Sequence, residues 1–244
     1  MEEEGARWRI QRYYAPKLTD FKRVLDCGCG NGISVDTLMA LGFDAWGIDL
    51  SALRKWQWRQ RQHRDRLAVA SALSLPFPDA SFDAVLSSGV IEHIGVSEIG
   101  GTTYSVTPLP ERDALRRQFL AELLRVTRAG GSIFVDAPNG RFPIDFWHGG
   151  VGGRGRWHSL SEGFLPTLGE ITRLVQSIDP KATVRMRSAR DRFAFRQVGR
   201  HWFGRVLRGP AALFLRALDL PGIRVLAPLV TPYLVVEIRT APAK

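Results

Sequence analysis

The residues with the clearest potential for chemistry form a short glycine-rich segment, Asp26-Cys27-Gly28-Cys29-Gly30-Asn31-Gly32. Glycines at alternate positions let a backbone approach a ligand closely, and the acid that precedes them can hold a positively charged group. The segment differs from the dinucleotide fingerprint G-x-G-x-x-G, because Ile33 stands where the third glycine would be. This spacing disfavours a nicotinamide-dependent dehydrogenase.

A second group of reactive side chains lies further along the chain. Glu92 and His93 follow an apolar stretch, and the loop 138–163 carries Asp145, His148 and His158 among aromatic residues. Imidazole exchanges protons near neutral pH, so a histidine in a ligand site can act as a general base. We expect this loop to be the wall of a substrate site; the alternative is a loop that packs its own aromatic residues.

Alternating strands and helices must position these residues. Residues 23–28 form a predicted strand that leads into the glycine segment, and a helix is predicted over 33–41. The same patterns predict strands at 44–49, 67–71, 82–88, 132–137, 183–187 and 233–239, and helices at 51–61, 112–127 and 168–178. Such alternation is typical of an α/β fold with a parallel, doubly wound sheet, in which ligands bind at the carboxyl ends of the strands.

Composition is compatible with a single domain. The chain has 244 residues, of which 45% are hydrophobic, and no uninterrupted apolar run reaches the roughly 18 residues that a membrane span needs. The acidic start, Met1-Glu2-Glu3-Glu4, has the wrong charge for a secretory signal, so we expect a cytoplasmic protein. The only two cysteines, Cys27 and Cys29, are too close for an ordinary disulfide and too few for a metal site. We interpret them as small residues that fill the loop.

Four segments in series resemble the class I S-adenosylmethionine-dependent methyltransferases, over about residues 23–140. The glycine segment resembles the family's first motif, and 71–83 resembles its "D-A-x-x-L-P-F-x-D-x-S-F-D" segment. Residues 87–93 match "x-x-G-V-x-E-H", and 128–131 resemble the "R-P-G-G" turn. The resemblance implies a Rossmann-like, seven-stranded, mostly parallel sheet with helices on both faces. It also implies an antiparallel last strand with a helical insertion before it.

The resemblance also implies which residues bind S-adenosylmethionine. Asp49 occupies the position whose carboxylate accepts hydrogen bonds from the ribose hydroxyls, and Leu50 beside it would pack on the adenine. Ser71 stands where the family has an acid that contacts the adenine amino group, which leaves that contact to Ser71 or to the Ala72 backbone. The full predicted set for the cofactor is Asp26, Gly28, Cys29, Gly30, Gly32, Asp49, Leu50, Ser71, Ala72, Ser88 and Gly89.

The same motifs narrow the acceptor. The chain lacks the "N/D-P-P-Y" segment of adenine and glutamine methylases and the Pro-Cys nucleophile of cytosine methylases. It is most similar to small-molecule methyltransferases of quinone, sugar and natural-product biosynthesis. Some quinone-pathway relatives bind a divalent cation here through an additional acid, but this chain has Gly89 at that place, so we expect no metal.

Three residues are predicted to be catalytic. Methyl transfer from a sulfonium is an in-line displacement, so alignment and exclusion of water can supply much of the acceleration. His93 has the best position for a base that deprotonates a hydroxyl, although Glu92 and His93 could simply cap and pack the end of the strand. Asp145 and His148, with His158 as a third candidate, are expected to orient the acceptor.

The positive charge is confined to the last quarter of the chain. The net charge is +10, yet residues 1–180 hold 21 basic and 21 acidic side chains, whereas residues 181–244 hold 13 basic and three acidic ones. Within 192–230, arginines alternate with Phe, Trp and Leu, a mixture suited to peripheral contact with an anionic membrane at its inner face. RNA binding would use the same chemistry, but we do not expect a nucleic-acid partner. The remaining alternative is a helical lid whose arginines point outward.

The sequence therefore predicts one methyltransferase domain, 1–244, that acts on a small-molecule acceptor, with oxygen expected as the acceptor atom rather than nitrogen or carbon. Within it, 1–140 would bind the cofactor, 138–163 the substrate, and 189–231 would form a basic helical insertion. Quinone, sugar and lipid-linked acceptors all fit. The rival hypothesis is a catalytically idle scaffold protein that keeps the nucleotide fold and docks a membrane or RNA through the insertion.

Overall fold

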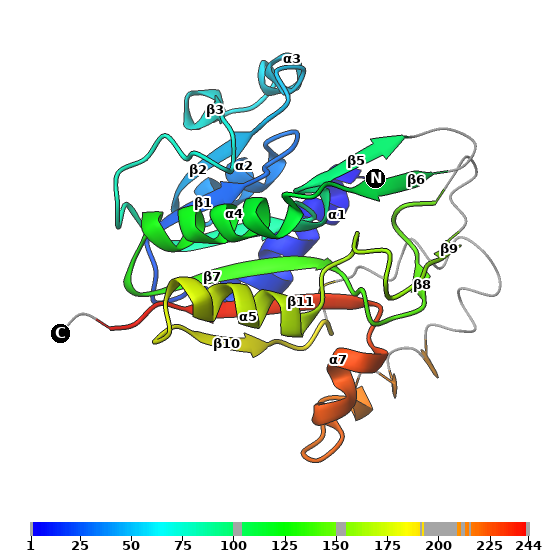
Figure 1. Cartoon of the computed structure of the whole chain (residues 1–244). Coiled ribbons are helices and arrows are strands. Elements are labelled where there is room, and N and C mark those ends of the chain that lie inside the picture. Colours follow the sequence, from blue (N-terminus) through cyan, green and yellow to red (C-terminus); the bar gives the residue numbers. More distant parts are fainter. Residues whose placement is uncertain are drawn as a thin grey trace.

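A seven-stranded sheet, with strand order β10-β11-β7-β4-β1-β2-β3, forms the centre of the molecule (Figure 1). The computed structural model describes residues 2–99, 104–149, 155–190, 192, 209–210, 213–214 and 216–242. β11 runs antiparallel to both of its neighbours, and all the other pairings are parallel, as predicted. The strands are β1 (Arg23–Cys27), β2 (Asp44–Asp49), β3 (Leu67–Val69), β4 (Phe82–Ser88), β7 (Thr127–Pro138), β10 (Thr183–Met186) and β11 (Tyr233–Arg239).

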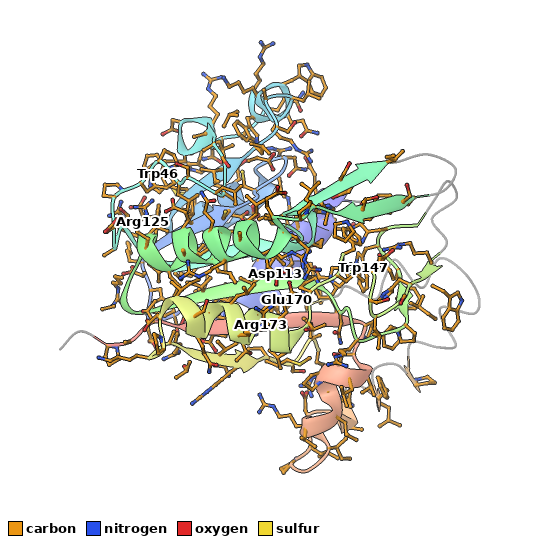
Figure 2. The ribbon with its side chains drawn as sticks, in the orientation of Figure 1. Trp46, Asp113, Arg125, Trp147, Glu170 and Arg173 are labelled. Atoms are coloured by element: carbon orange, nitrogen blue, oxygen red, sulfur yellow. The ribbon has the colours of Figure 1, made fainter. Side chains whose placement is uncertain are left out.

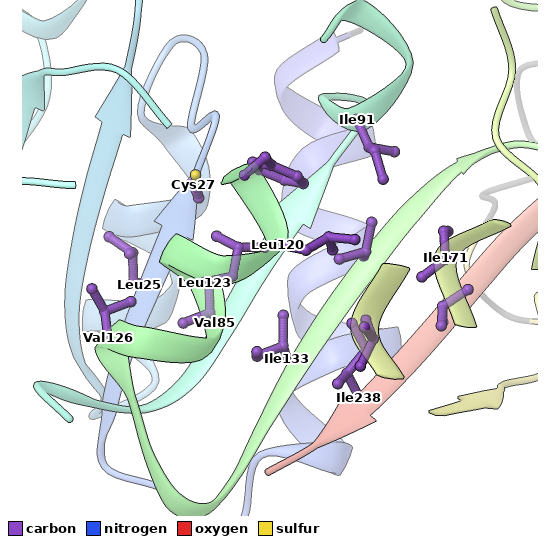
Figure 3. Close-up of a cluster of buried hydrophobic side chains, with 14 of the residues drawn as sticks. Leu25, Cys27, Val85, Ile91, Leu120, Leu123, Val126, Ile133, Ile171 and Ile238 are labelled. Carbon is purple, nitrogen blue, oxygen red and sulfur yellow. The ribbon is translucent and has the colours of Figure 1, made fainter. Parts of the chain in front are cut away.

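One face of this sheet is covered by α4 (Arg112–Val126) and α5 (Leu168–Ile178). Successive strand residues point to opposite faces, so alternate apolar residues of each strand enter the same core. Figure 3 shows this cluster, in which strand residues meet Leu120 and Leu123 of α4 and Ile171 of α5. The strand residues labelled there are Leu25, Cys27, Val85, Ile133 and Ile238, and each is at most 1% exposed.

The opposite face is covered by N-terminal elements and by α2 (Ile33–Ala40). The chain begins with α1 (Glu2–Trp8), continues through the π-helical η1 (Arg9–Tyr14) and ends this segment at η2 (Ala15–Lys17). Tyr13 and Tyr14 of η1 are buried with Leu38 of α2 and with the strand residues that point to this side. The residue patterns predict no element in the first 22 residues, so this cover is seen only in the structure.

A buried ion network fixes α5 against α4 and extends to the turn after β4. Arg116 is fully buried, and its Nη1 donates to Glu170 Oε1 at 2.8 Å. The other nitrogens of Arg116 donate to the backbone carbonyls of Glu92, Ile94 and Phe164. At the surface, Asp113 and Arg173 extend the network near Glu170 (Figure 2). The position of the turn that carries Glu92 and His93 therefore depends on a side chain of α4.

Besides the N-terminal cover, the sequence predictions differ from the structure at the start of β7, which begins at Thr127 and not at residue 132, and at two elements near the site. The helix predicted over 51–61 is α3 (Arg54–Trp58), because the Ser51 N–H donates to Asp49 Oδ1 at 2.9 Å and forms a turn that delays the helix. A hairpin was also missed between β4 and α4. It consists of β5 (Val96–Ile99) and β6 (Ser105–Pro108).

Further short elements are the paired β8 (Ile144–Asp145) and β9 (Arg156–Trp157), the helical turns η3 (Arg64–Arg66), η4 (Ile91–His93) and η6 (Arg224–Leu226), and α7 (Ala227–Val230). Across the described part of the chain, no helix is both long enough and apolar enough to span a membrane.

Candidate functional site: a glycine cradle beside a histidine–carboxylate cluster

The glycine loop connects β1 to α2 at the point where the strand order reverses, since the chain leaves β1 for β2 on one side and returns to β4 on the other. Crevices at such switch points are the usual ligand sites of open α/β sheets. Gly28 and Gly30 have φ values of +91° and +54°, a region that residues with a Cβ rarely adopt. Among the described residues no atom lies within 4 Å of the place that a Cβ on Gly30 would take, so the loop is open at Gly30.

Asp26 lies at the carboxyl end of β1 and is 6% exposed. The hydroxyl of Ser34 on α2 donates to its Oδ2. Burial raises the pKa of Asp26 to about 6, against the opposing effect of that hydrogen bond. A cationic group of a ligand placed here would stabilise the ionised form of Asp26, which the protein alone stabilises only weakly. The two neighbouring cysteines, Cys27 and Cys29, are buried free thiols, as expected for loop-filling residues.

Asp49 is placed at the end of β2 with its carboxylate toward the loop. Its Oδ2 accepts the Gly30 N–H at 2.9 Å, and its Oδ1 accepts the Ser51 N–H at the same distance. Each carboxylate oxygen retains a further lone pair, which suits two adjacent hydroxyl donors. Leu50 beside it is 74% exposed, so an apolar side chain is available for a planar ring.

A tryptophan and a serine border the same cradle. Trp58 of α3 is buried and donates its indole N–H to the Gly30 carbonyl at 2.9 Å, which fixes the loop. Ser71 follows β3, and its hydroxyl accepts the Leu73 N–H at 3.1 Å. Ser71 and Ala72 therefore lie in a turn directly after the strand that pairs with the end of β2, close in the fold to Asp49.

Ser88 and Gly89 end β4 beside a buried polar network centred on Asp136 of β7. The guanidinium of Arg192 donates to both carboxylate oxygens of Asp136 and to Ser88 Oγ at 2.9 Å. Tyr14 and Tyr233 also donate their hydroxyls to Asp136. Burial alone would raise the pKa of Asp136, but the charge of Arg192 holds this pKa below its ordinary value.

His93, on the turn η4, is held by the unpredicted hairpin. Its Nδ1 lies 2.6 Å from Glu98 Oε1 of β5, and the Tyr104 hydroxyl donates to the other oxygen of Glu98. The side chain of His93 is 41% exposed. No signal in the sequence identified Glu98, because its contact with His93 depends on how the hairpin folds back.

His148 reaches the same place from the loop after β7. The centroids of the His93 and His148 rings are 5.2 Å apart, and Phe164 packs edge-on against His148 at 4.8 Å. Asp145 is fully buried and lies 2.9 Å from His148 Nδ1. Burial alone would raise the pKa of Asp145. The hydrogen bonds from His148 and from backbone N–H groups outweigh burial and hold this pKa below its ordinary value. The three predicted catalytic residues therefore lie in one cluster with Glu98.

Two other residues named in the sequence analysis, His158 and Glu92, have different surroundings. His158 lies outside the cluster, with its ring nitrogens 2.6 Å from the Phe142 carbonyl and 3.2 Å from the Ser159 carbonyl. Glu92 is 1% exposed, and its Oε2 has no hydrogen-bond partner within the described residues. Burial raises the pKa of Glu92 to about 7.

Of the predicted insertion 189–231, residues 191, 193–208, 211–212 and 215 lie outside the described residues.

Comparison with known proteins relates the part of this site within residues 25–135 to a family. Residues 25–135 match the family model described as a methyltransferase domain. A probable S-adenosylmethionine-dependent methyltransferase of Mycolicibacterium smegmatis is 30% identical over 116 residues, which cover 48% of this chain and 38% of that protein. The 2-methyl-6-phytyl-1,4-hydroquinone methyltransferase of Synechocystis is 33% identical over 132 residues, which cover 51% of this chain and 36% of that protein. The chain thus spans only about two fifths of the length of these relatives.

A solved structure supports the fold across nearly the whole chain. The S-adenosylmethionine-dependent methyltransferase from Archaeoglobus fulgidus aligns with a TM-score of 0.55 and 14% identity, covering 98% of this chain and 94% of that one. The open glycine cradle, the two-oxygen acceptor at Asp49 and the exposed Leu50 all fit the parts of S-adenosylmethionine. Residues 25–135 therefore form a methyltransferase domain similar to that of S-adenosylmethionine-dependent methyltransferases, and this similarity supports S-adenosylmethionine as the cofactor.

Proposed function

We propose that the protein transfers a methyl group from S-adenosylmethionine to a hydroxyl oxygen of a small-molecule acceptor. The observation that carries this proposal is the cluster of His93, His148 and their carboxylate partners at the end of β4. A neutral amine already carries a nucleophilic lone pair and has less need of such a group, whereas a neutral hydroxyl becomes a strong nucleophile only when its proton is lost.

The cofactor would lie along the carboxyl ends of β1, β2 and β4. Bound there, S-adenosylmethionine supplies an electrophilic methyl group on a sulfonium. Asp26 would orient its ammonium group, Asp49 its ribose hydroxyls, and Leu50 its adenine ring. Ser88 and Gly89 would border the methyl group, because they end the strand that leads into the turn of His93.

The acceptor would lie between this turn and the loop 138–163. Tyr104, Phe164 and the two imidazoles form an aromatic wall, and Phe146 and Trp147 are 53% and 41% exposed near it in sequence. Such a wall suits a planar ring, so a quinol or another ring-bearing natural product is the favoured class, with sugars and lipid-linked acceptors as the next. The hydroquinone acceptor in the name of the Synechocystis relative agrees with this class.

The cluster would deprotonate the acceptor hydroxyl, and the protein would otherwise align it and exclude water. Asp145 and Glu98 each engage an Nδ1, which fixes the orientation of the rings and leaves the other nitrogen of each free to face the acceptor. Positioning of the hydroxyl in line with the reacting carbon is itself a large part of the catalysis of a displacement.

The test is to measure methyl transfer and cofactor affinity in matched histidine variants. An extract screen with isotopically labelled methyl donor first identifies the acceptor and the labelled atom. His93→Gln and His148→Gln should then lower kcat by about 100-fold or more while cofactor affinity stays within about twofold. His63→Gln is the control, since His63 forms the same kind of pair with Asp36 elsewhere and should leave both unchanged. A label on nitrogen or carbon refutes the proposal, and a protein without cofactor affinity by calorimetry supports the scaffold hypothesis.

We further propose that the C-terminal segment contacts an anionic membrane surface. Large apolar side chains of this segment are exposed, among them Leu213 (68%), Phe214 (45%) and Val225 (74%), next to Arg216 and Arg224. Exposed apolar residues flanked by arginines favour a lipid interface.

Co-sedimentation with anionic vesicles tests this contact. We expect binding that weakens with salt and falls in Phe214→Ser and Val225→Ser. Leu53→Ser serves as control, because Leu53 is 84% exposed but lies outside this segment. Equal retention on neutral vesicles, or binding that survives both substitutions, contradicts it. Binding to RNA in place of vesicles supports the nucleic-acid alternative.

A further inference from the structure

The cluster at the end of β4 has the geometry of a metal site. One potential ligand atom from each of Glu92, His93 and His148 lies within 4.8 Å of the other two. Glu92 and His93 come from the turn η4, and His148 comes from the loop after β7, about fifty residues later in the chain. Ligands bound to one first-row ion stand about 3 to 4 Å from each other, so small side-chain movements would complete the site.

The two imidazoles are arranged as metal-binding imidazoles usually are. Glu98 engages Nδ1 of His93 at 2.6 Å, and Asp145 engages Nδ1 of His148 at 2.9 Å. A carboxylate on one ring nitrogen fixes the tautomer and makes the opposite nitrogen, Nε2, a better ligand. Both carboxylates come from elements other than η4, so the fold supplies this support separately for each ring.

Glu92 is the third potential ligand, and contacts with the described residues do not satisfy its carboxylate. Its side chain is 1% exposed, yet its Oε2 has no hydrogen-bond partner among the described residues. The buried Arg116 donates to the backbone carbonyl of Glu92 and not to its carboxylate. A buried carboxylate oxygen without a partner is costly, and a cation at this place would compensate it.

We propose that Glu92, His93 and His148 bind one divalent first-row transition ion such as Zn²⁺, Co²⁺ or Mn²⁺. Two imidazoles and one carboxylate favour these ions over Mg²⁺ and Ca²⁺, which prefer oxygen ligands. The sequence predicted no metal because Gly89 replaces an acid used by some relatives; His148 supplies the third ligand from another loop. Three protein ligands leave coordination positions open for a further molecule.

The open positions give the ion a function at the acceptor site, and this step rests on the proposed hydroxyl acceptor. A hydroxyl bound to such an ion loses its proton more readily, and the proton passes to solvent water. The acceptor oxygen then remains on the ion as an anion. In the loaded protein the ion would take over the activation from the free imidazoles, whose nitrogens are used for coordination.

Titration with Co²⁺ tests binding without cofactor or acceptor. The full chain, freed of metal by chelation, should bind one Co²⁺ and develop the visible absorption of a nitrogen-ligated site, and Zn²⁺ should displace it. His148→Gln should weaken Co²⁺ binding by at least about tenfold. His158→Gln is the control, because both ring nitrogens of His158 already face backbone carbonyls outside the cluster. Should His148→Gln unfold in a thermal melt, His93→Gln serves instead, since that side chain is 41% exposed.

Two results would overturn the metal site. One is absence of Co²⁺ binding at millimolar concentration, and the other is binding that both His148→Gln and His93→Gln leave unchanged. Displacement of Co²⁺ by equimolar Mg²⁺ would refute the choice of ion. If hydroxyl methylation persists without any bound metal, the role of the ion is refuted and the proposed function stands. If the protein binds Co²⁺ but methylates nitrogen, the metal site stands and the proposed function is refuted.

Discussion

Asp26 should destabilise the cofactor-free protein at neutral pH and yet be required for cofactor binding. Asp26→Asn should therefore stabilise the free protein at neutral pH and weaken its binding of S-adenosylmethionine. Burial raises the pKa of this carboxyl from 3.8 to about 6. The folded state therefore binds the proton more tightly than the unfolded state. The stability that protonated Asp26 contributes is fully present below about pH 4 and is lost as the pH rises through about 6.

The size of the effect follows from the shift. A difference of about two pKa units corresponds to about 3 kcal/mol in total, of which about 2 kcal/mol is lost between about pH 4.5 and pH 7.5. Asp26→Asn removes the titrating group and keeps an oxygen that can accept the Ser34 hydroxyl. The difference in the free energy of unfolding between the variant and the parent should therefore move by about 2 kcal/mol in favour of the variant over this range.

Urea denaturation at several pH values, without cofactor, measures this difference. In parallel, calorimetry should show that the affinity of the parent for S-adenosylmethionine falls by up to about tenfold per pH unit below about 6, because the ammonium group needs the ionised carboxylate. The variant should bind more weakly at pH 7.5 and lose this pH dependence. A stability difference that stays constant from about pH 4.5 to 7.5 would refute the assignment of the raised pKa to Asp26.

Three further predictions concern the loop and the network beside it. Gly28→Ala should cost at least about 2 kcal/mol of stability and abolish tight cofactor binding, because its Cβ would lie 2.3 Å from a neighbouring side chain. Gly42→Ala, at a similar φ of +89° but in open space, isolates the backbone cost of about 1 kcal/mol in the same urea titration. Arg192→Met should cost about 3 to 5 kcal/mol by leaving Asp136 buried without its cation, and Arg192→Lys should recover part of it. Trp58→Phe should weaken cofactor binding several-fold in calorimetry and cost about 1 to 2 kcal/mol of stability, since it removes one hydrogen bond to the loop and shortens a buried side chain.

The cofactor half could be predicted from the sequence because its determinants are local. Asp26 and Asp49 each end a strand of strong apolar pattern, and their neighbours in sequence, the glycine loop and Leu50, are also their neighbours in space. The order of strands and helices then fixes where the strand ends meet. Such a site is specified by short segments placed at one edge of the sheet.

The acceptor half could be predicted only in part, because its contacts join distant segments. The histidines were identifiable by residue type, but Glu98 meets His93 through a hairpin whose residues are mostly exposed and polar, which gives no apolar alternation to detect. Asp136 looked like an ordinary strand residue, although its partner Arg192 lies 56 residues away. Pairings of this length follow from tertiary packing, which residue patterns within a single segment do not encode.

The Asp136 network also links the two proposals about surface and site. Arg192 lies where the basic segment 192–230 begins, and it donates to Ser88 at the end of β4 as well as to Asp136. Tyr14 from the N-terminal cover and Tyr233 from β11 join the same carboxylate. Because Asp136 is fully buried, a loss of its charged partner is expensive, and the network favours one position of Arg192. Arg192 therefore joins the start of the basic segment to the strand end at Ser88, where we propose that the methyl donor binds.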